Sequence, residues 1–164
     1  MSKGTIHRTT LYALATVTLC LAALASRAEG PSGLIGTWVL DVGKSTFDPG
    51  PPVKSDKITI SDAGGGALHF TGDLVEGDGG AHHFELTGAL DGKEVPVTGW
   101  ADYADAAVLT KRGPDSFHLV LKKAGKAIEW DTFHLSKSGQ KMYGRLAGND
   151  NGTRWKYHWV ADRQ

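Results

Sequence analysis

Alternating apolar and polar side chains predict a β-strand over residues 36–42. Trp38, Leu40 and Val42 fall on one face of this segment, and polar side chains occupy the other, which is the two-residue period of a half-buried strand. The following residues, 44–53, contain three prolines. Proline lacks a backbone donor and favours an extended, exposed path. We therefore expect one strand and then a long loop that contains no strand interior.

Short alternating runs continue from this loop to the C-terminus, separated by clusters of Gly, Asn and Asp. Such clusters supply the positive φ that tight hairpin turns require. No run in this region keeps the 3.6-residue apolar period of an amphipathic helix. The link at 100–105 is the least regular, and residues 104–109 could form a helical turn instead of a strand. The nine further predicted strands lie at 56–61, 67–75, 81–90, 94–99, 106–112, 116–123, 126–136, 140–147 and 152–161.

Ten strands joined mostly by short turns favour an antiparallel up-and-down meander, because Greek-key sandwiches need some long crossings. An open meander of this length would leave two unpaired edges that invite aggregation. Closing the sheet removes both edges. A barrel of this size can also enclose a cavity for one small ligand. The sequence therefore predicts an all-β fold consisting of a single antiparallel up-and-down barrel of about ten strands.

The first 28 residues have the pattern of a secretory signal peptide. A basic start precedes an uncharged apolar run at 11–24, which is too short to cross a bilayer. Ser26-Arg27-Ala28 then places small residues where a signal peptidase cleaves. Cys20 is not preceded by the small residue that a lipoprotein signal needs. We expect cleavage after Ala28 and an exported domain, 29–164, located in the periplasm or outside the cell.

Composition narrows the function of the exported domain. Its 136 residues suffice for one hydrophobic core. The domain has no cysteine, which excludes disulfides and thiolate metal sites. The whole chain has 18 basic and 18 acidic residues; without Lys3, Arg8 and Arg27 the balance is 15 to 18, a net charge of −3. A nucleic-acid or anionic-membrane binder would need a basic face, so neither partner is expected, and no later segment is apolar enough to span a membrane.

Gly36-Thr37-Trp38, at the head of the first predicted strand, resembles the Gly-x-Trp signature of the lipocalins and the wider calycins. The resemblance implies that Trp38 closes one end of the barrel and that an arginine from a late strand lies across it. Arg154 is the nearest candidate for this arginine, and Arg145 is the second. Residues 29–35 could form one turn that plugs the same end.

A longer likeness covers most of the exported domain. Residues 36–51 and 86–99 resemble segments of bacterial exported lipocalin-like proteins, a group for which the resemblance implies no activity. The chain departs from better-known relatives because it shows neither the C-terminal helix of lipocalins nor the helical lid of fatty-acid-binding proteins. The Arg-x-Tyr carboxylate clamp of the latter is also missing, since Arg154 and Tyr157 are three apart and point to opposite faces of a strand.

The last predicted strand offers one aromatic and one cationic face. Burying unpaired cations is costly, whereas burying aromatic rings is favourable, so the aromatic face should line the barrel interior. Ile128, Trp130, Thr132 and His134 share a face that we expect to lie nearby, with the last two as polar groups that orient a guest. The predicted ligand-binding residues are Trp38, Leu40, Phe70, His82, Phe84, Trp130, Thr132, His134, Trp155, Tyr157 and Trp159.

The candidate catalytic groups have plainer interpretations. His82 and His134 are expected to point inward, where a histidine could hold a ligand, transfer protons or bind haem iron, although a structural hydrogen-bonded role is commoner. Glu129 and Asp131 share a strand face and are expected to face solvent. Zinc would require three or four converging ligands. We therefore assign no catalytic residue, no metal ligand and no cofactor.

The favoured hypothesis is an exported, monomeric protein that holds a small apolar molecule inside its barrel. The first alternative is a calycin-type enzyme or a haem-binding barrel that uses an inward histidine. The second is a structural or envelope interaction protein that binds no ligand.

Overall fold

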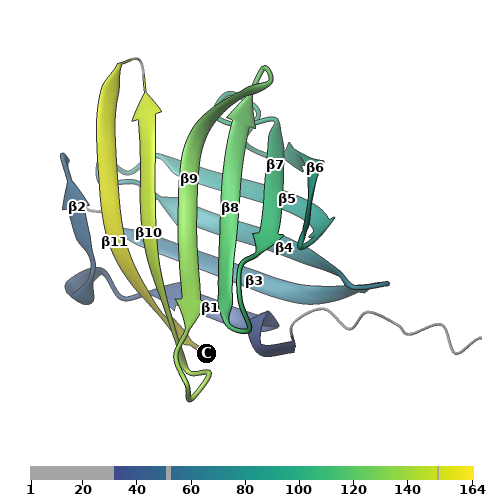
Figure 1. Ribbon diagram of the computed structural model, residues 1–164. Helices are drawn as coiled ribbons and strands as arrows, with labels where there is room; N and C mark the ends of the chain where they lie inside the picture. Colours follow the sequence, from purple (N-terminus) through teal and green to yellow (C-terminus); the bar gives the residue numbers. More distant parts are fainter. Residues whose placement is uncertain (1–31, 51–52, 151) are drawn as a thin grey trace, which may run out of the picture.

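The computed structural model describes residues 32–50, 53–150 and 152–164, which form an antiparallel β-barrel (Figure 1). Two short 3-10 helices, η1 (Ser32–Leu34) and η2 (Val42–Lys44), flank the first strand. The predicted signal peptide, 1–28, lies outside the described residues. The strands are β1 (Gly36–Leu40), β2 (Thr46–Asp48), β3 (Ser55–Gly64), β4 (Ala67–Val75), β5 (Ala81–Ala89), β6 (Asp91–Thr98), β7 (Ala106–Lys111), β8 (Ser116–Lys123), β9 (Lys126–Leu135), β10 (Lys141–Asp150) and β11 (Thr153–Arg163).

The sheet closes on itself. Consecutive strands pair from β3 to β11, and β1 completes the ring by pairing with β3 on one side and β11 on the other. At the closure, Trp38 is the register partner of both Ile58 and Arg163. The predicted all-β fold, an antiparallel up-and-down barrel of ten strands, is confirmed.

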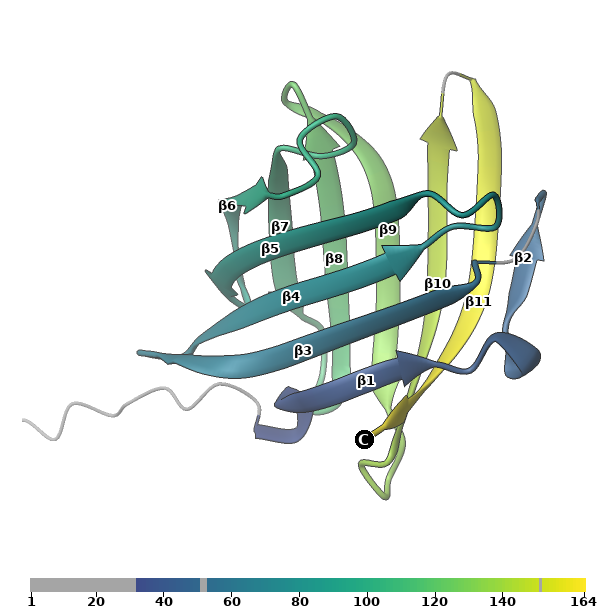
Figure 2. The same ribbon diagram turned by 180° about the vertical axis from the view of Figure 1, so that it is seen from behind.

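The barrel has two walls whose strands cross steeply. Figure 2 shows β1, β3, β4 and β5 in the near wall and β7 to β11 in the far wall. β6 connects the walls, and its pairing with β5 involves only residues 85–86 and 97–98. Side chains on the concave faces of both walls therefore point toward one interior space.

The prediction that 44–53 contains no strand is wrong in part, because Thr46–Asp48 forms the short eleventh strand, β2. β2 pairs with β11 at His158–Lys156, beyond the point where β1 leaves that edge. The three residues precede the first proline of the loop and so retain their backbone donors. The following prolines then limit the strand, which is a common way to blunt a sheet edge.

The irregular link at 100–105 is a turn, and the alternative helical turn at 104–109 is wrong. The backbone N–H groups of Tyr103 and Ala104 both donate to the Trp100 carbonyl. β7 then begins at Ala106 and pairs with β8 along its whole length. This turn carries the Trp100 and Tyr103 side chains to one end of the barrel.

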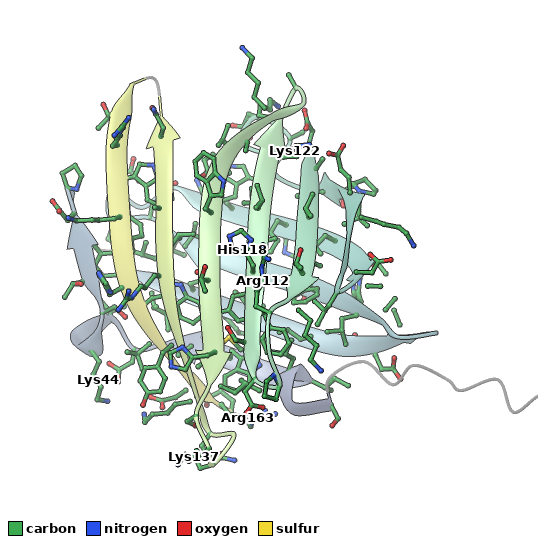
Figure 3. The ribbon with its side chains drawn as sticks, viewed as in Figure 1. Lys44, Arg112, His118, Lys122, Lys137 and Arg163 are labelled. Atoms are coloured by element: carbon green, nitrogen blue, oxygen red, sulfur yellow. The ribbon has the colours of Figure 1, made fainter. Side chains whose placement is uncertain are left out.

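The opposite end is filled. Leu34 of η1 is fully buried, and its carbonyl accepts a hydrogen bond of 2.9 Å from the Trp38 indole N–H. Phe117 is also fully buried and stacks on Phe133, with ring centroids 5.5 Å apart. Figure 3 places Arg163 at this same end, beside η1. Leu34 and Trp38 thus seal the base of the barrel, as predicted for Trp38 and for a plug within 29–35, a segment that is described from residue 32 on. Any opening of the barrel lies at the other end.

Candidate ligand-binding cavity

A cavity of about 690 Å³ occupies the barrel interior above this sealed base. A volume in this range suits one small organic molecule. Most of the lining is aliphatic or aromatic and comes from both walls. The mouth is bordered by residues 49–50 and 53 and by two loops that contain residues 76–78 and 100–104.

The aromatic face of β11 forms one side of the cavity. Trp155, Tyr157 and Trp159 all line it, which agrees with the burial argument made for the last strand. Trp155 and Tyr157 pack together with centroids 4.9 Å apart. Tyr157 also makes an edge contact with Phe47 of β2, again at 4.9 Å. β2 therefore supports this aromatic wall near the mouth.

Two glycines of β10 make room for the indoles. Gly144 is the register partner of Trp159, and Gly148 is the register partner of Trp155. A Cβ atom at Gly144 would lie 2.0 Å from Trp159, and one at Gly148 would lie 2.2 Å from Trp155. The indoles therefore lie against the β10 backbone. Because the rings cover the wall and do not fill the interior, the barrel stays hollow there.

Aromatic side chains also gather at the mouth. Trp100 stacks on Tyr103 with centroids 4.5 Å apart, and His82 stacks on the same indole at 4.2 Å. Trp100 and Tyr103 line the cavity, whereas His82 lies beside it, where its Nε2 is 3.4 Å from a Glu76 carboxylate oxygen. His82 thus supports the rim.

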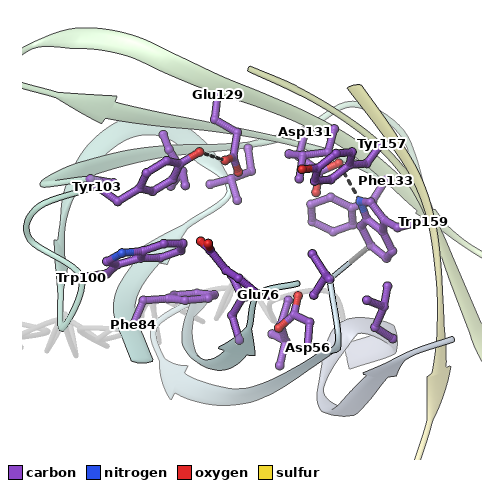
Figure 4. A pocket seen from close by; sticks show the side chains of 18 of the residues that line it. Asp56, Glu76, Phe84, Trp100, Tyr103, Glu129, Asp131, Phe133, Tyr157 and Trp159 are labelled. Atoms are coloured by element: carbon purple, nitrogen blue, oxygen red, sulfur yellow. Dashed lines mark hydrogen bonds between the residues drawn. The ribbon is translucent and has the colours of Figure 1, made fainter. Parts of the chain in front are cut away.

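Two buried carboxyl groups and a third that is partly buried face this aromatic space (Figure 4). Glu129 and Asp131 come from β9, and their exposed fractions are only 9% and 7%. The Tyr103 hydroxyl donates to Glu129 Oε2, and the Trp159 indole N–H donates to Asp131 Oδ1 at 3.2 Å. Asp56, on β3 in the other wall, has a buried Oδ1 that finds no hydrogen-bond partner among the described residues.

The surroundings of these carboxyls favour their neutral forms. Burial raises the pKa of Glu129 to about 7, and the hydrogen bond from Tyr103 opposes this rise. Burial and the charge of Asp73 raise the pKa of Asp56 to about 7. Burial and the neighbouring charge of Glu129 raise the pKa of Asp131 well above its usual range. These are the effects expected for like charges in a space of low dielectric constant.

The expected orientation of β9 is wrong, because Glu129 and Asp131 face the interior instead of solvent. Burial alternates along the strand, with residues 129, 131, 133 and 135 buried and the intervening ones exposed. The register of β8 against β9 shifts where Leu121 pairs with Glu129 and Lys122 with Ala127. Ile128 is skipped at this bulge, and it packs against the core although it is one residue out of phase with the inward face.

Trp130, Thr132 and His134 therefore lie on the outside of the barrel, which corrects their assignment as ligand-binding residues. Trp130 is 43% exposed. His134 stacks on Tyr143 with centroids 5.4 Å apart. Both His134 and Thr132 line a shallow outer depression together with His158. The alternation from Ile128 that predicted an inward face is interrupted by the bulge.

The other predicted site residues lie as follows. Trp38 is at the base, His82 is at the rim, and the cavity is lined by Leu40, Phe70, Phe84, Trp155, Tyr157 and Trp159. Four further lining residues were not predicted from the sequence, namely Asp56, Glu76, Trp100 and Tyr103, and neither was the aliphatic wall formed by Leu119 and Leu121. A signal for the acidic pair was present, since Phe133 and Leu135 share its strand face.

The histidine-based alternatives lose their geometric basis. No histidine belongs to the cavity lining in the part of the chain that the structure describes. Within those same residues, no group of three or more His, Cys, Asp or Glu side chains is arranged to hold a metal ion. None of the helices in the described part of the chain is long and apolar enough to cross a membrane.

The sequence matches no known protein-family model and no curated protein. Solved structures are similar in fold. EF1p2_mFAP2b bound to DFHBI superposes with a TM-score of 0.53 at 11% identity, over 85% of this chain and all of that one. Rv2717c from M. tuberculosis superposes with a TM-score of 0.51 at 16% identity, over 81% of this chain and 94% of that one. The siderocalin Ex-FABP superposes with a TM-score of 0.41 at 12% identity, over 80% of this chain and 71% of that one. The first two matches agree with the closed antiparallel β-barrel fold that the strand topology shows.

Proposed function

We propose that this protein is an exported binding protein that holds one small, mainly apolar molecule inside its barrel. The observation that carries the proposal is the cavity of about 690 Å³ above a sealed base, with a mouth at the opposite end. One structural neighbour, EF1p2_mFAP2b, was solved with DFHBI bound, which supports small-molecule binding by a barrel of this shape. Export is supported by the signal-like pattern of residues 1–28.

The cavity favours binding over a purely structural role. A barrel that served only as a scaffold would be stabilised by filling its interior, because empty apolar space forfeits packing contacts. Here Gly144 and Gly148 keep the aromatic wall flat, and the interior remains open. Hollow, pre-formed apolar sites with a few polar groups are typical of ligand pockets.

Nile red, a neutral apolar dye that brightens in dry pockets, provides a direct test with the purified exported domain. We expect saturable binding that Leu121→Trp abolishes, because Leu121 lines the cavity. Val120→Trp is the matched control, since Val120 pairs with exposed Trp130 on the outer surface. The protein as isolated should also carry a copurified small molecule in native mass spectrometry.

Failure of Nile red to bind, or equal binding by wild type and Leu121→Trp, would contradict the proposed site. In either case the structural alternative would be preferred. Circular dichroism should show that both tryptophan variants keep the β-barrel, so that lost binding reflects a filled cavity.

A further inference from the structure

The cavity is acidic as well as apolar. Five carboxyl side chains contribute to its lining, and none of the lining residues that the structure describes is lysine, arginine or histidine. The five carboxyl side chains are those of Asp56, Glu76, Asp78, Glu129 and Asp131. Lys44 and Lys122 are absent from the lining and pair with Asp41 and Glu94, and Figure 3 shows Lys44 and Lys137 at the margin of the barrel. A site for fatty acids or other anions would need the opposite charge.

We propose that the ligand is an apolar organic molecule with a protonated amine, whose ammonium group is held between Asp56 on one wall and Glu129 and Asp131 on the other. This inference rests on the proposed function and specifies the chemical class of its ligand.

Asp56 provides the first independent support. A buried polar atom without a hydrogen-bond partner is rare in folded proteins, because desolvation costs free energy that no contact returns. Asp56 Oδ1 is such an atom, and Asp56 lines the cavity. Glu129 and Asp131 each use one oxygen to accept a bond from Tyr103 or Trp159. An ammonium group has three donors and no acceptor, which matches the acceptor oxygens that these carboxyl groups offer when they are ionised.

The aromatic rings provide the second support. Cations bind favourably over the faces of Trp and Tyr rings, most strongly where water is excluded. Tyr103, Tyr157 and Trp159 border the space between the carboxyl groups, and Trp100 stacks on Tyr103 (Figure 4). The aliphatic wall formed by Leu119 and Leu121 can then cover the apolar part of the same ligand. Rings and carboxylates around one apolar space are the features that recognise organic ammonium ions.

Two other occupants fit less well. A metal ion would require at least three converging ligands, and the described residues contain no such group. A neutral ligand with hydrogen-bond acceptors would require the carboxyls to stay protonated, so that they donate. This second case makes the opposite prediction for pH dependence, and an experiment can therefore separate it.

Ligand charge and carboxyl protonation are linked. Burial raises the pKa values of Asp56 and Glu129 to about 7, so protons compete with a cationic ligand below that pH. The other titratable groups around them are Asp73, Glu76, Asp78, Tyr103, Asp131 and Tyr157, and none of these is cationic. Amine affinity should therefore rise as the pH increases through neutrality, with release of protons.

The test compares three ligands of one shape: phenylbutylamine, phenylbutanol and phenylbutyrate. Each is titrated against Nile red bound to the exported domain, at about pH 6 and about pH 8. We expect the amine to displace the dye at least about tenfold more tightly than the alcohol at the higher pH. Its affinity should fall at the lower pH, and the anion should be the weakest.

Neutral variants locate the interaction. Asp56→Asn and Glu129→Gln preserve shape and should each remove most of the preference for amine over alcohol while Nile red still binds. Glu85→Gln is the matched control, because Glu85 is an acid on the outer face of β5, where it contacts His83. It should leave the preference unchanged.

The outcomes are distinct. If Nile red binds but the alcohol or the anion displaces it as well as the amine does, or if amine affinity falls as the pH rises, the amine inference is overturned and the cavity proposal stands. If none of the three compounds displaces bound dye, the inference is likewise overturned. If Nile red itself does not bind, the proposed function fails.

Discussion

The Arg163 guanidinium lies over the Trp38 indole, with its central carbon 4.3 Å from the ring centroid. The same side chain donates hydrogen bonds to the carbonyls of Gly139, Ile35 and Gly33, at 2.7, 2.5 and 2.5 Å. One arginine near the C-terminus thus ties the last strand, the β9–β10 turn and the segment before β1 together. The base of the barrel is held by this contact as well as by apolar packing.

This arrangement is the one that the lipocalin resemblance implies, but the expected arginines, Arg154 and Arg145, are wrong. Arg154 is on the outer face of β11 and exposed. Arg163 lies nine residues after Arg154. Because side chains alternate between the two faces of a strand, Arg163 is on the same face as Trp155, Tyr157 and Trp159. Arg154 alternates with Trp155, Tyr157 and Trp159, so it could not face inward together with them, whereas Arg163 can.

Trp38→Ala should destabilise the protein by about 3–5 kcal/mol, because Trp38 is only 2% exposed and plugs the base. That is a large part of a typical unfolding free energy of about 5–15 kcal/mol. Chemical denaturation measures the change. Trp130→Ala is the control, since exposed Trp130 should contribute less than about 1 kcal/mol. Equal effects of the two substitutions would show that Trp38 does not close the barrel.

Arg163→Met should cost about 2 kcal/mol, because it removes the cation–π contact and leaves three carbonyls without their donor. Combining it with Trp38→Ala tests the pair directly. We expect a coupling energy of about 0.5–3 kcal/mol in the double-mutant cycle. Arg154→Met should change the stability by no more than about 0.5 kcal/mol. Strict additivity of the two core substitutions would argue against an energetic contact between them.

The strand pattern of the chain could be predicted because turn residues delimit it. The bounds of β4 and β8 agree with the predicted 67–75 and 116–123, since Gly-rich or Asp-containing turns border both. β2 was missed because its pairing with β11 depends on how the barrel closes. The position of Arg163 across from Trp38 depends on that same long-range register, which local periodicity does not encode.

The acidic site was missed for a different reason. Charged residues on a strand usually face water. The prediction that Glu129 and Asp131 face solvent followed this rule, although Phe133 and Leu135 lie on the same face of the strand. The bulge at Ile128 made the opposite face look apolar. Asp56 could not be paired with these acids from sequence, because β3 and β9 lie in different walls and are not neighbours in the sheet.

The signal peptide remains a prediction, because residues 1–28 lie outside the described part of the chain. N-terminal sequencing of the protein recovered from the exported fraction should begin at Glu29. Retention of the first 28 residues in that fraction would contradict the predicted cleavage. Replacement of Ala28 by a bulky residue should block processing, because the peptidase requires small residues at this site.

Gly144→Ala should destabilise the barrel by about 1–3 kcal/mol, because its Cβ would overlap the Trp159 indole. The displaced indole would lose its hydrogen bond to Asp131 and move into the cavity. Thermal unfolding and Nile red binding should therefore both weaken. Gly113→Ala is the control, since the nearest atom to a Cβ there is 3.7 Å away. Unchanged dye binding in Gly144→Ala would show that the indole does not border the binding space.

The buried carboxyls predict an unusual pH dependence of stability. The folded pKa of Glu129 is about 7, compared with 4.5 for a free side chain. A group whose folded pKa is raised binds more protons in the folded state, so its contribution to the unfolding free energy falls as pH rises between these two values. Below about pH 4 the group is protonated in both states, and above about pH 8 it is ionised in both.

Glu129→Gln removes this ionisation while keeping a similar side-chain shape. The variant should match wild type near pH 4 and exceed its unfolding free energy by roughly 3 kcal/mol near pH 8, since one pKa unit corresponds to about 1.4 kcal/mol. Denaturant titrations at several pH values measure the difference, and exposed Glu85→Gln should show no such trend. A Glu129→Gln protein that is less stable than wild type at pH 8 would mean that the ionised carboxylate stabilises the barrel. The acidic site would then be compensated by a group inside the protein, and a cationic ligand would not be needed to neutralise it.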